Sequence, residues 1–265
     1  MLSLRSLTKV FERGTVNENC VLDDLSLSLA AGDFVTIIGS NGAGKSTLFN
    51  AICGSIALDT GMVVLDGKDI TKQRDYKRAQ DIGRLFQDPH TGTAADFSIE
   101  ENLALVYAKV KGRFALQQAI RKDDRLFFEE QVLRLGMGLE KRMKMRVGLL
   151  SGGQRQALTL LLATLSPPKL LLLDEHTAAL DPLSAKAVLS LTEDITKKHR
   201  ITTLMITHNI SDALSMGNRT IMMAHGKVVM DIAQDERRYM TVADLLERYK
   251  KQVHHDLDTD RIVFS

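Results

Sequence analysis

The sequence has few of the residues that mark disulfide-rich, metal-clustered or membrane-spanning proteins. Its 265 residues include two cysteines (Cys20 and Cys53), four prolines and no tryptophan. Two cysteines are too few for a disulfide framework or a four-ligand zinc site, so we interpret them as reduced thiols in a cytosolic chain. No apolar run approaches the ~18 residues of a transmembrane helix. The run Leu170–Leu173 is bounded by Lys169 and Asp174, and residues 1–10 lack the apolar segment of a signal peptide.

Neither sign of charge dominates the sequence. The 35 basic residues are balanced by 33 acidic ones, for a net charge of +2. This balance gives the chain no overall drive toward nucleic acid or an anionic membrane. The hydrophobic fraction of 44% is too high for a mainly disordered chain. The length fits one large domain or a core with an inserted lobe.

Strand-like and helix-like stretches alternate along the chain, which is typical of a layered α/β protein. Short apolar runs predict strands that are covered on both faces, and Asp-Gly and His-Gly pairs between such runs predict hairpins. The predicted strands are Phe34–Ile38, Leu170–Leu173 and Thr203–Ile206, with hairpins at Asp66-Gly67 and His225-Gly226.

The pattern changes to mostly helical between about Asp88 and Leu165. Ser98 and Glu101 form the pattern of a capping box, which predicts a helix through Ala108. A later stripe predicts another helix, with Phe127, Phe128, Val132 and Leu135 on one face. Residues 111–146 hold ten Lys and Arg against five Asp and Glu. We interpret this excess as solvated helix faces rather than as a nucleic-acid surface.

A glycine-rich loop follows the predicted strand Phe34–Ile38. Residues 39–46 read Gly-Ser-Asn-Gly-Ala-Gly-Lys-Ser and match the pattern G-x-x-x-x-G-K-[ST] in full. The glycines let backbone amides line an anion site, and the helix expected over Thr47–Ile52 adds positive potential. Lys45 would reach the β- and γ-phosphates and the Ser46 hydroxyl would hold Mg²⁺. The loop therefore predicts binding of a nucleoside triphosphate.

A second motif narrows the class of protein. Leu150-Ser151-Gly152-Gly153-Gln154 lies downstream of the phosphate loop and shortly before an acidic strand. With these features the chain resembles the ABC transporter ATPases over nearly its whole length. In that family the pentapeptide is the signature motif and begins a helix. The hydroxyl and glycine amides at such a helix start suit a phosphate group.

The apolar run Leu170–Leu173 ends in two carboxylates, Asp174 and Glu175. They would lie at the C-terminal end of a strand, where ligands gather in parallel sheets. The resemblance implies that Asp174 is the Walker B aspartate, which acts on Mg²⁺ through water. It implies that Glu175 is the general base that polarises the attacking water. The alternative is that the two carboxylates only cap the following helix.

The resemblance implies roles for further residues. Gln87 matches the Q-loop glutamine, which contacts Mg²⁺ and the attacking water and couples to the transmembrane partner. Asp181 matches the D-loop, and His208 matches the switch histidine that contacts the γ-phosphate. Phe11 resembles the aromatic residue that stacks on adenine, although core packing would also explain a Phe. The remaining residues expected to bind ATP are Ser40, Asn41, Gly42, Ala43, Gly44, Thr47, Ser151, Gly152, Gly153 and Gln154.

The sequence departs from the family at His176, where most members have proline. The change frees a backbone torsion and adds a titratable side chain that we expect close to the phosphates. Catalysis should survive, because neither carboxylate is altered. A hypothesis is that His176 tunes the turnover rate with pH.

The resemblance implies a P-loop NTPase core with a mostly parallel sheet, an antiparallel β subdomain and an inserted helical subdomain. We expect the core over residues 1–87 and 166–240, and the helical subdomain with the signature motif over 88–165. A C-terminal helix and tail would occupy 241–265. There Thr241 is the expected cap, and one face carries Val242, Leu245, Leu246 and Tyr249. The tail from Val253 is polar and expected to fray.

The resemblance also implies partners. Two ATP molecules would lie between two chains, with the phosphate loop of one facing Ser151–Gln154 of the other, in a homodimer or a pair with a similar subunit. The lobe around Asp88–Asn102 would dock a cytosolic helix of a membrane permease. The protein would then lie on the cytoplasmic face of the cell membrane without a transmembrane segment of its own.

Several stretches are similar to a bacterial importer subgroup that works with a branched-chain-amino-acid-like permease and an extracytoplasmic binding protein. They are Gly14–Glu18, Phe86–Pro89, Gly92–Asp96, Ser98–Leu103 and Glu175–Pro182. Some members of that subgroup are linked to aromatic amino acids. A soluble ABC ATPase acting as an assembly or scaffold factor would share every catalytic residue, and an exporter ATPase is a further alternative. A nucleic-acid ATPase is disfavoured, because no coiled-coil insert, zinc module or second ATPase half is present.

Overall fold

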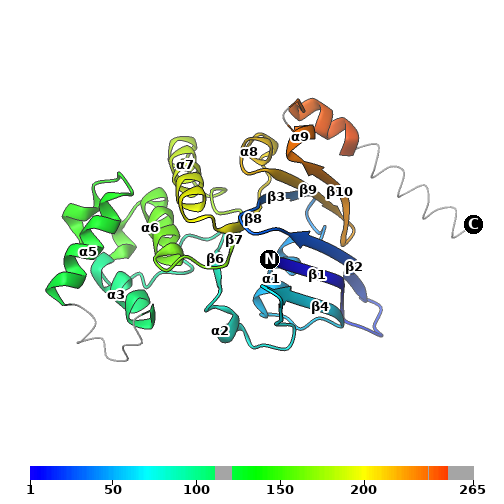
Figure 1. Ribbon diagram of the computed structural model, residues 1–265, viewed down its shortest axis with the longest axis horizontal. Helices are drawn as coiled ribbons and strands as arrows, with labels where there is room; N and C mark the ends of the chain where they lie inside the picture. The colour runs from blue at the N-terminus through cyan, green and yellow to red at the C-terminus, as the bar shows by residue number, and fades with distance from the viewer. Residues whose placement is uncertain (111–120, 238, 250–265) are drawn as a thin grey trace, which may run out of the picture. The chain divides into compact units, whose positions relative to one another are not determined.

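The computed structural model describes residues 1–110, 121–237 and 239–249 (Figure 1). The chain forms two compact units, one of residues 1–82 with 200–265 and the other of residues 83–199. The tail predicted from Val253 and part of the basic stretch after Lys111 lie outside the described residues. Mixed strands and helices in both units confirm the predicted α/β class.

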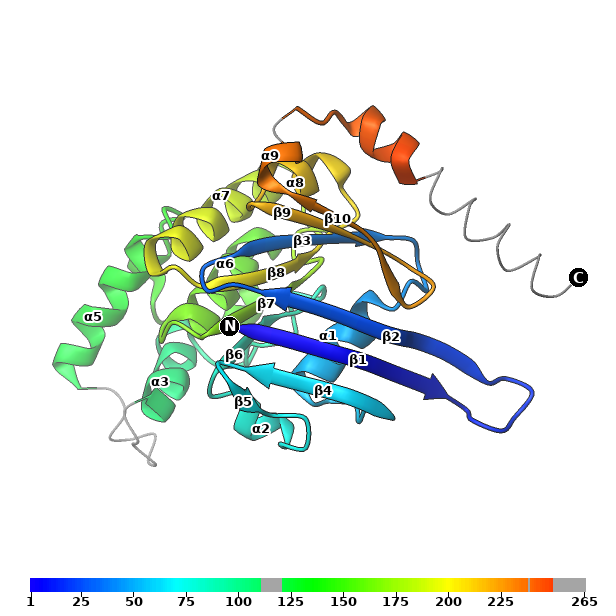
Figure 2. The ribbon, with the colours of Figure 1, turned by 45° about the vertical axis from the view of Figure 1, so that its right-hand side comes forward.

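The first unit contains an antiparallel sheet in the order β2-β1-β4-β5. Figure 2 shows β1 between β2 and β4. The hairpin predicted at Asp66-Gly67 is confirmed, because Leu65 pairs with Lys68 and both turn residues have positive φ, as a type I′ turn requires. The strands are β1 (Leu2–Phe11), β2 (Asn19–Leu29), β4 (Thr60–Leu65) and β5 (Lys68–Asp69).

The other strands of this unit belong to a second sheet, in which they follow the order β10-β9-β3-β8. Strand β3 runs parallel to β8 and to β9, whereas β10 pairs antiparallel with β9 across the predicted His225-Gly226 turn. Every residue of β8 is buried, as expected of a strand covered on both faces. The bounds are β3 (Phe34–Gly39), β8 (Thr202–Ile206), β9 (Arg219–Ala224) and β10 (Lys227–Ala233).

The helices of the first unit that lie within its described residues include α1 (Lys45–Cys53), α2 (Asp75–Arg78), α8 (Ile210–Ser215) and α9 (Gln234–Arg237). A further helix covers residues 242–249, and Thr241 caps it by accepting a hydrogen bond from the Asp244 amide at 3.2 Å. Leu245 is fully buried beside Ala213 and Ile232, but Val242 and Leu246 are exposed. Only part of the apolar face predicted for this helix therefore packs.

The second unit has its own core, built mainly from helices. The predicted capping box is present at the start of α3, where Ser98 Oγ accepts from the Glu101 amide and the Glu101 carboxylate accepts from the Ser98 amide. Phe128 and Val132 are fully buried, as the stripe predicts. The elements are β6 (Ile82–Leu85), α3 (Ile99–Val110), α5 (Lys122–Leu133), η1 (Leu139–Arg142), η2 (Val147–Leu149), α6 (Gly152–Thr164), β7 (Leu170–Asp174) and α7 (Pro182–His199).

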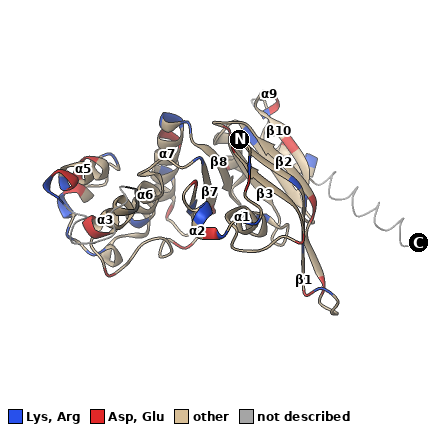
Figure 3. Cartoon of the chain, turned by 60° about the horizontal axis from the view of Figure 1, so that its bottom comes forward, with Lys and Arg blue, Asp and Glu red and all other residues tan. Residues whose placement is uncertain are grey.

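The surface of α5 carries both signs of charge (Figure 3). Glu130 pairs with Arg134 one turn later, and Arg125 pairs with Glu100 of α3. This mixture agrees with solvated helix faces rather than a uniform basic surface. Among the described residues no helix combines the length and hydropathy needed to cross a membrane.

A buried arginine closes the C-terminal end of α1, the helix that begins in the phosphate loop. Arg78 is 4% exposed. Its guanidinium donates to the carbonyls of Ala51 and Ile52 at 2.8 Å, and to those of Thr71 at 2.7 Å and Gln73 at 3.0 Å. A cation at a helix C-terminus also complements the helix dipole. Arg78 thus fixes the far end of the helix whose start carries the phosphate loop.

Replacing Arg78 by Met should lower the free energy of unfolding by about 3 kcal/mol, because buried carbonyls lose a charged donor. The measurement is the midpoint of urea denaturation. Lys77→Met is the matched control, since Lys77 is exposed on the same short helix, and it should change stability by no more than about 0.5 kcal/mol. Equal losses in the two variants would contradict the role given to Arg78.

Candidate functional site

The phosphate loop is held against its own unit by close backbone contacts. At Gly39 a methyl group would collide with the Met223 carbonyl, and at Gly44 it would lie 2.5 Å from the Val21 carbonyl. Gly44 also has a φ of +94°, which disfavours any residue with a side chain. The Gly226 amide donates to the Ala43 carbonyl at 3.2 Å, so the β9–β10 hairpin fixes the loop.

Lys45 begins α1 and is 6% exposed. Its Nζ atom donates to the carbonyls of Gly39 at 2.7 Å and Ser40 at 2.9 Å, which keeps the ammonium against the loop. Ser46 is exposed and Thr47 half-buried in the first turn, where a helix has N–H groups without intrahelical partners. An ammonium, a hydroxyl and helix-start amides converge on one place, which is the chemistry of a polyphosphate site.

Two further predicted residues belong to this first unit. Phe11 ends β1 with 38% of its surface exposed, and Lys9 Nζ lies 5.2 Å from the centre of its ring. His208 is exposed just after β8. The neighbouring Asn209 caps α8 by accepting from the Ser211 amide at 2.9 Å. The first unit thus carries the predicted adenine aromatic, phosphate loop and switch histidine.

The second unit carries the predicted carboxylates. Asp174 is the last residue of β7 and is 8% exposed, while Glu175 is half-buried in the turn that follows. Glu175 has a φ of +48°, a conformation that non-glycine residues adopt at a cost of about 1–3 kcal/mol. The next helix, α7, is capped instead by Asp181, whose Oδ1 accepts from the amides of Leu183 and Ser184. The helix-cap alternative for Asp174 and Glu175 therefore has no support.

Asp181 is held as a carboxylate by its cap. Hydrogen bonds from the Ser184 side chain and then from the Ser184 amide lower the pKa of Asp181 below its ordinary value. The predicted D-loop residue therefore stays charged at the start of α7, where the helix dipole favours an anion.

Sequence reasoning missed one residue of this region, Arg84. Its Nη2 atom donates to Asp174 Oδ2 at 3.0 Å, and the two side chains are only 13% and 12% exposed. Its guanidinium carbon lies 4.7 Å from the centre of the Phe86 ring. The signal in the sequence is a single cation within the otherwise apolar run Ile82–Phe86.

The signature motif forms a capping box at the start of α6. Ser151 Oγ accepts from the Gln154 amide at 3.3 Å, and the Gln154 side chain accepts from the Ser151 amide at 3.2 Å. Gly153 allows α7 to approach, since a Cβ there would lie 2.7 Å from the Ser184 side chain. Ser151 and Gly152 are exposed. The motif therefore presents a hydroxyl and a helix N-terminus on the surface of the second unit.

Arg155 connects the signature helix to the loop after Gln87. The Arg155 guanidinium is buried and donates to the Gly148 carbonyl at 2.9 Å and to the ring of His90. Gln87 itself is exposed just beyond β6. The predicted Q-loop segment and the signature helix are thus tied together within one unit.

His176 does not lie open beside the proposed catalytic residues. It is 2% exposed, and burial lowers the pKa of His176 to about 4. Its Nε2 lies 3.3 Å from Thr192 Oγ1, and that hydroxyl donates to the Val188 carbonyl, so Nε2 is the donor of the pair. The hypothesis that His176 tunes turnover is not supported, because the buried ring faces α7 and is uncharged near neutral pH.

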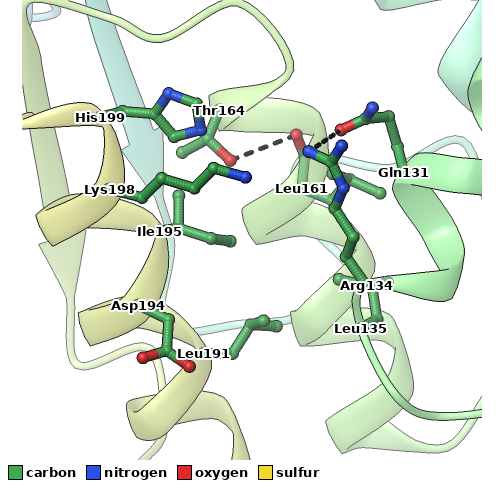
Figure 4. Close-up of a pocket in the computed structure, with 10 residues that line it drawn as sticks. All are labelled: Gln131, Arg134, Leu135, Leu161, Thr164, Leu191, Asp194, Ile195, Lys198 and His199. Atoms are coloured by element: carbon green, nitrogen blue, oxygen red, sulfur yellow. Dashed lines mark hydrogen bonds between the residues drawn. The ribbon is translucent and has the colours of Figure 1, made fainter.

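A cavity of about 230 Å³ lies between α5, α6 and α7 (Figure 4). Its lining residues are Gln131, Arg134, Leu135, Leu161, Thr164, Leu191, Asp194, Ile195, Lys198 and His199. None of them was predicted to bind nucleotide, and the charged ones are exposed at its edge. The cavity therefore does not belong to the predicted nucleotide site.

The burial of His176 makes stability depend on pH. The unfolded chain protonates this residue at the ordinary pKa of 6.5, whereas the folded chain does so only near 4. Stability contributed by the neutral ring is complete above pH 6.5 and is lost as the pH falls toward 4. Between pH 7.5 and pH 5 the loss should be on the order of 2 kcal/mol.

The measurement is urea denaturation of wild type and His176→Gln at both pH values. His176→Gln should not show the loss of stability that the protonation of His176 causes between the two pH values. His199→Gln changes an exposed histidine and should show the same loss as wild type. The same pH dependence in wild type and His176→Gln would contradict the burial of an uncharged ring.

Comparisons with known proteins show the family of the chain. Residues 22–178 match the family described as ABC transporter. The chain is 42% identical to the tyrosine transport ATP-binding protein of Clostridioides difficile, over 96% of this chain and all of that protein. It is 34% identical to the phosphonates import ATP-binding protein PhnC of Halobacterium salinarum, over 84% of this chain and 77% of that one.

Solved structures give the same result. The fold is similar to the dimeric ATP-binding cassette MJ0796 in a post-hydrolysis state with ADP and Pi, with a TM-score of 0.75 and 26% identity. The match covers 88% of this chain and 99% of that one. The extent of these matches and the two nucleotide-site motifs lead to one conclusion. The chain belongs to the ABC transporter family, as an ATP-binding protein that hydrolyses ATP.

Proposed function

We propose that the protein powers solute import through a separate membrane permease. The observation that carries the ATP-binding part of this proposal is the anchored phosphate loop, with the Lys45 ammonium held against the carbonyls of Gly39 and Ser40. The import direction is supported by the similar phosphonates import ATP-binding protein, and the similar tyrosine transport ATP-binding protein supports a role in transport.

The phosphates of ATP would lie against the backbone amides of the loop. The amides at the start of α1 and the positive end of its dipole favour an anion there. Lys45 would exchange its two loop carbonyls for phosphate oxygens, which are stronger acceptors because they are charged. Residues 40–44 and Thr47 line the same turn, and Phe11 would stack on the adenine ring.

The donor set fits a magnesium ion that arrives with its nucleotide. The described residues contain no group of three or more His, Cys, Asp or Glu side chains placed to hold a metal. Mg²⁺ is commonly held by one or two protein oxygens together with substrate phosphates, and Ser46, Gln87 and Asp174 supply hard oxygen donors of this kind. When bound, the ion would neutralise charge on the phosphates.

Hydrolysis would depend on groups that position and activate water. Glu175 would accept a proton from the attacking water, and its turn, strained at φ +48°, would hold the carboxylate in place. His208 would donate to the γ-phosphate, and Gln87 would help to orient the water. Each role keeps a group in position before reaction, which is how enzymes lower the barrier of phosphoryl transfer.

The signature motif would complete the site of a second copy. The exposed Ser151 hydroxyl and the N-terminus of α6 would together bind an anion. The motif has no basic side chain, so it suits the phosphate of an ATP molecule that the phosphate loop of another copy already binds. The similar cassette MJ0796 is a dimer. A homodimer, or a pair with a similar subunit, would bind two ATP molecules between the copies, with Asp181 close to the shared interface.

The other partners would be an integral permease and an extracytoplasmic binding protein of the same system. Docking of a permease helix on the segment around residues 88–102 would place the protein on the cytoplasmic face of the membrane. The similar protein of Clostridioides difficile is a tyrosine transport ATP-binding protein, so an amino acid is the solute that we propose. We also propose that residues 1–87 and 166–240 form the nucleotide-binding core, with 88–165 as the helical subdomain.

Glu175→Gln should trap a dimer in the presence of ATP and Mg²⁺. The amide keeps the shape of the side chain but cannot act as a base, so turnover should fall by roughly 10²–10⁴-fold. Light scattering after gel filtration would show the mass of the complex. Lys45→Ala on the same background is the control and should stay monomeric. A Glu175→Gln protein that stays monomeric at saturating ATP would contradict the pairing or the assignment of the base.

The transport role is tested by capture from native membranes. Tagged Glu175→Gln protein with ATP and Mg²⁺ should recover a polytopic permease from detergent extracts, and untagged protein is the control. The identity of the permease would lead to the solute. Recovery of soluble proteins alone would contradict the importer role and favour an assembly or scaffold factor.

A further inference from the structure

Arg84 and Asp174 form a shielded ion pair at a point where the proposed function needs a free carboxylate. The Nη2 to Oδ2 distance is 3.0 Å, and both side chains are less exposed than those of the surface pairs Lys9–Asp59 and Arg219–Asp231. An ion pair with so little exposure is screened less by water and salt than a surface pair. The charge of Arg84 therefore acts strongly on Asp174.

The position of the guanidinium is set by the fold. Strands β6 and β7 are hydrogen-bonded neighbours, which brings Arg84 beside the end of β7. The buried neighbours Ile82 and Leu85 hold β6 in place. On its other side the guanidinium lies 4.7 Å from the centre of the Phe86 ring, a cation–π distance. The strand pairing and the Phe86 ring thus set the position of the Arg84 side chain.

A carboxylate that is already paired with a cation is a poor ligand for a divalent ion. Asp174 Oδ2 is engaged by Arg84, and a metal ion approaching Asp174 meets the positive charge of the guanidinium. The negative charge of a nucleotide triphosphate offsets this repulsion. Asp174 can therefore bind a metal ion that arrives with ATP, whereas binding of the metal ion alone is disfavoured.

We propose that Arg84 is a positioning residue that neutralises Asp174 before nucleotide arrives, and so makes metal binding depend on ATP. This inference rests on the proposed function, in which Asp174 acts on Mg²⁺. The role differs from catalysis, because Arg84 acts through Asp174 rather than on the reacting atoms.

The test is a Mg²⁺ titration of ATP binding by the full chain, followed with a fluorescent ATP analogue. Arg84→Gln keeps a hydrogen-bond donor and removes the charge, so the Mg²⁺ concentration at half-saturation should fall by roughly tenfold. Arg84→Lys keeps the charge and should stay close to wild type. Arg134→Gln is the matched control, because it breaks the exposed Arg134–Glu130 pair in the same unit and should change nothing.

A direct readout uses Mn²⁺ in place of Mg²⁺ without nucleotide. Electron paramagnetic resonance should detect weak Mn²⁺ binding in Arg84→Gln and none in wild type at the same concentrations. Phe86→Leu removes the ring beside the guanidinium and should shift the Mg²⁺ titration in the same direction by a smaller factor. That variant decides the question if Arg84→Gln does not fold.

Asp174→Asn distinguishes a failure of the metal role of Asp174 from a failure of the role of Arg84. If Mg²⁺ strengthens ATP binding in wild type and this effect is lost in Asp174→Asn, the metal role of Asp174 holds. An unchanged or higher Mg²⁺ requirement in Arg84→Gln would then overturn the role of Arg84 alone. If Asp174→Asn keeps the full Mg²⁺ effect, the proposed metal role fails, and the inference about Arg84 fails with it.

Discussion

The phosphate loop depends on close backbone packing more than on any single side chain. Gly39 and Gly44 face the carbonyls of Met223 and Val21, which leave no room for a Cβ atom. The Gly226 amide fixes the loop through the Ala43 carbonyl. Strands distant in sequence therefore hold the loop in one shape, so that little ordering of its backbone is needed when a ligand binds.

A different constraint governs the carboxylates of the second unit. Four buried leucines hold β7 in the interior and bring Asp174 to its end at 8% exposure. A charge in such a place needs a partner, and Arg84 supplies it. The same principle explains His176, which has no charged partner and lies uncharged against Thr192. Burial thus decides the charge state of His176.

Local patterns predicted many elements of this fold correctly. The hairpins at Asp66-Gly67 and His225-Gly226 and the capping box at Ser98 depend on neighbouring residues, and each is present. Sequence patterns predicted less well which apolar residues are buried, because burial depends on the packing between elements. At the C-terminal helix the period predicts one apolar face, but Leu245 is buried while Leu246 is exposed, because the sheet beneath covers only part of that face.

The sequence by itself determined the family and the residues of the nucleotide-site motifs, because a phosphate loop and a signature motif need fixed residues at fixed spacing. Only the tertiary structure decided which side chains surround those motifs. It pairs Arg84 with Asp174, joins Arg155 to His90 and turns His176 into the interior. These contacts join residues from separate elements, and the uncharged state of His176 arises from its burial, which no local pattern encodes.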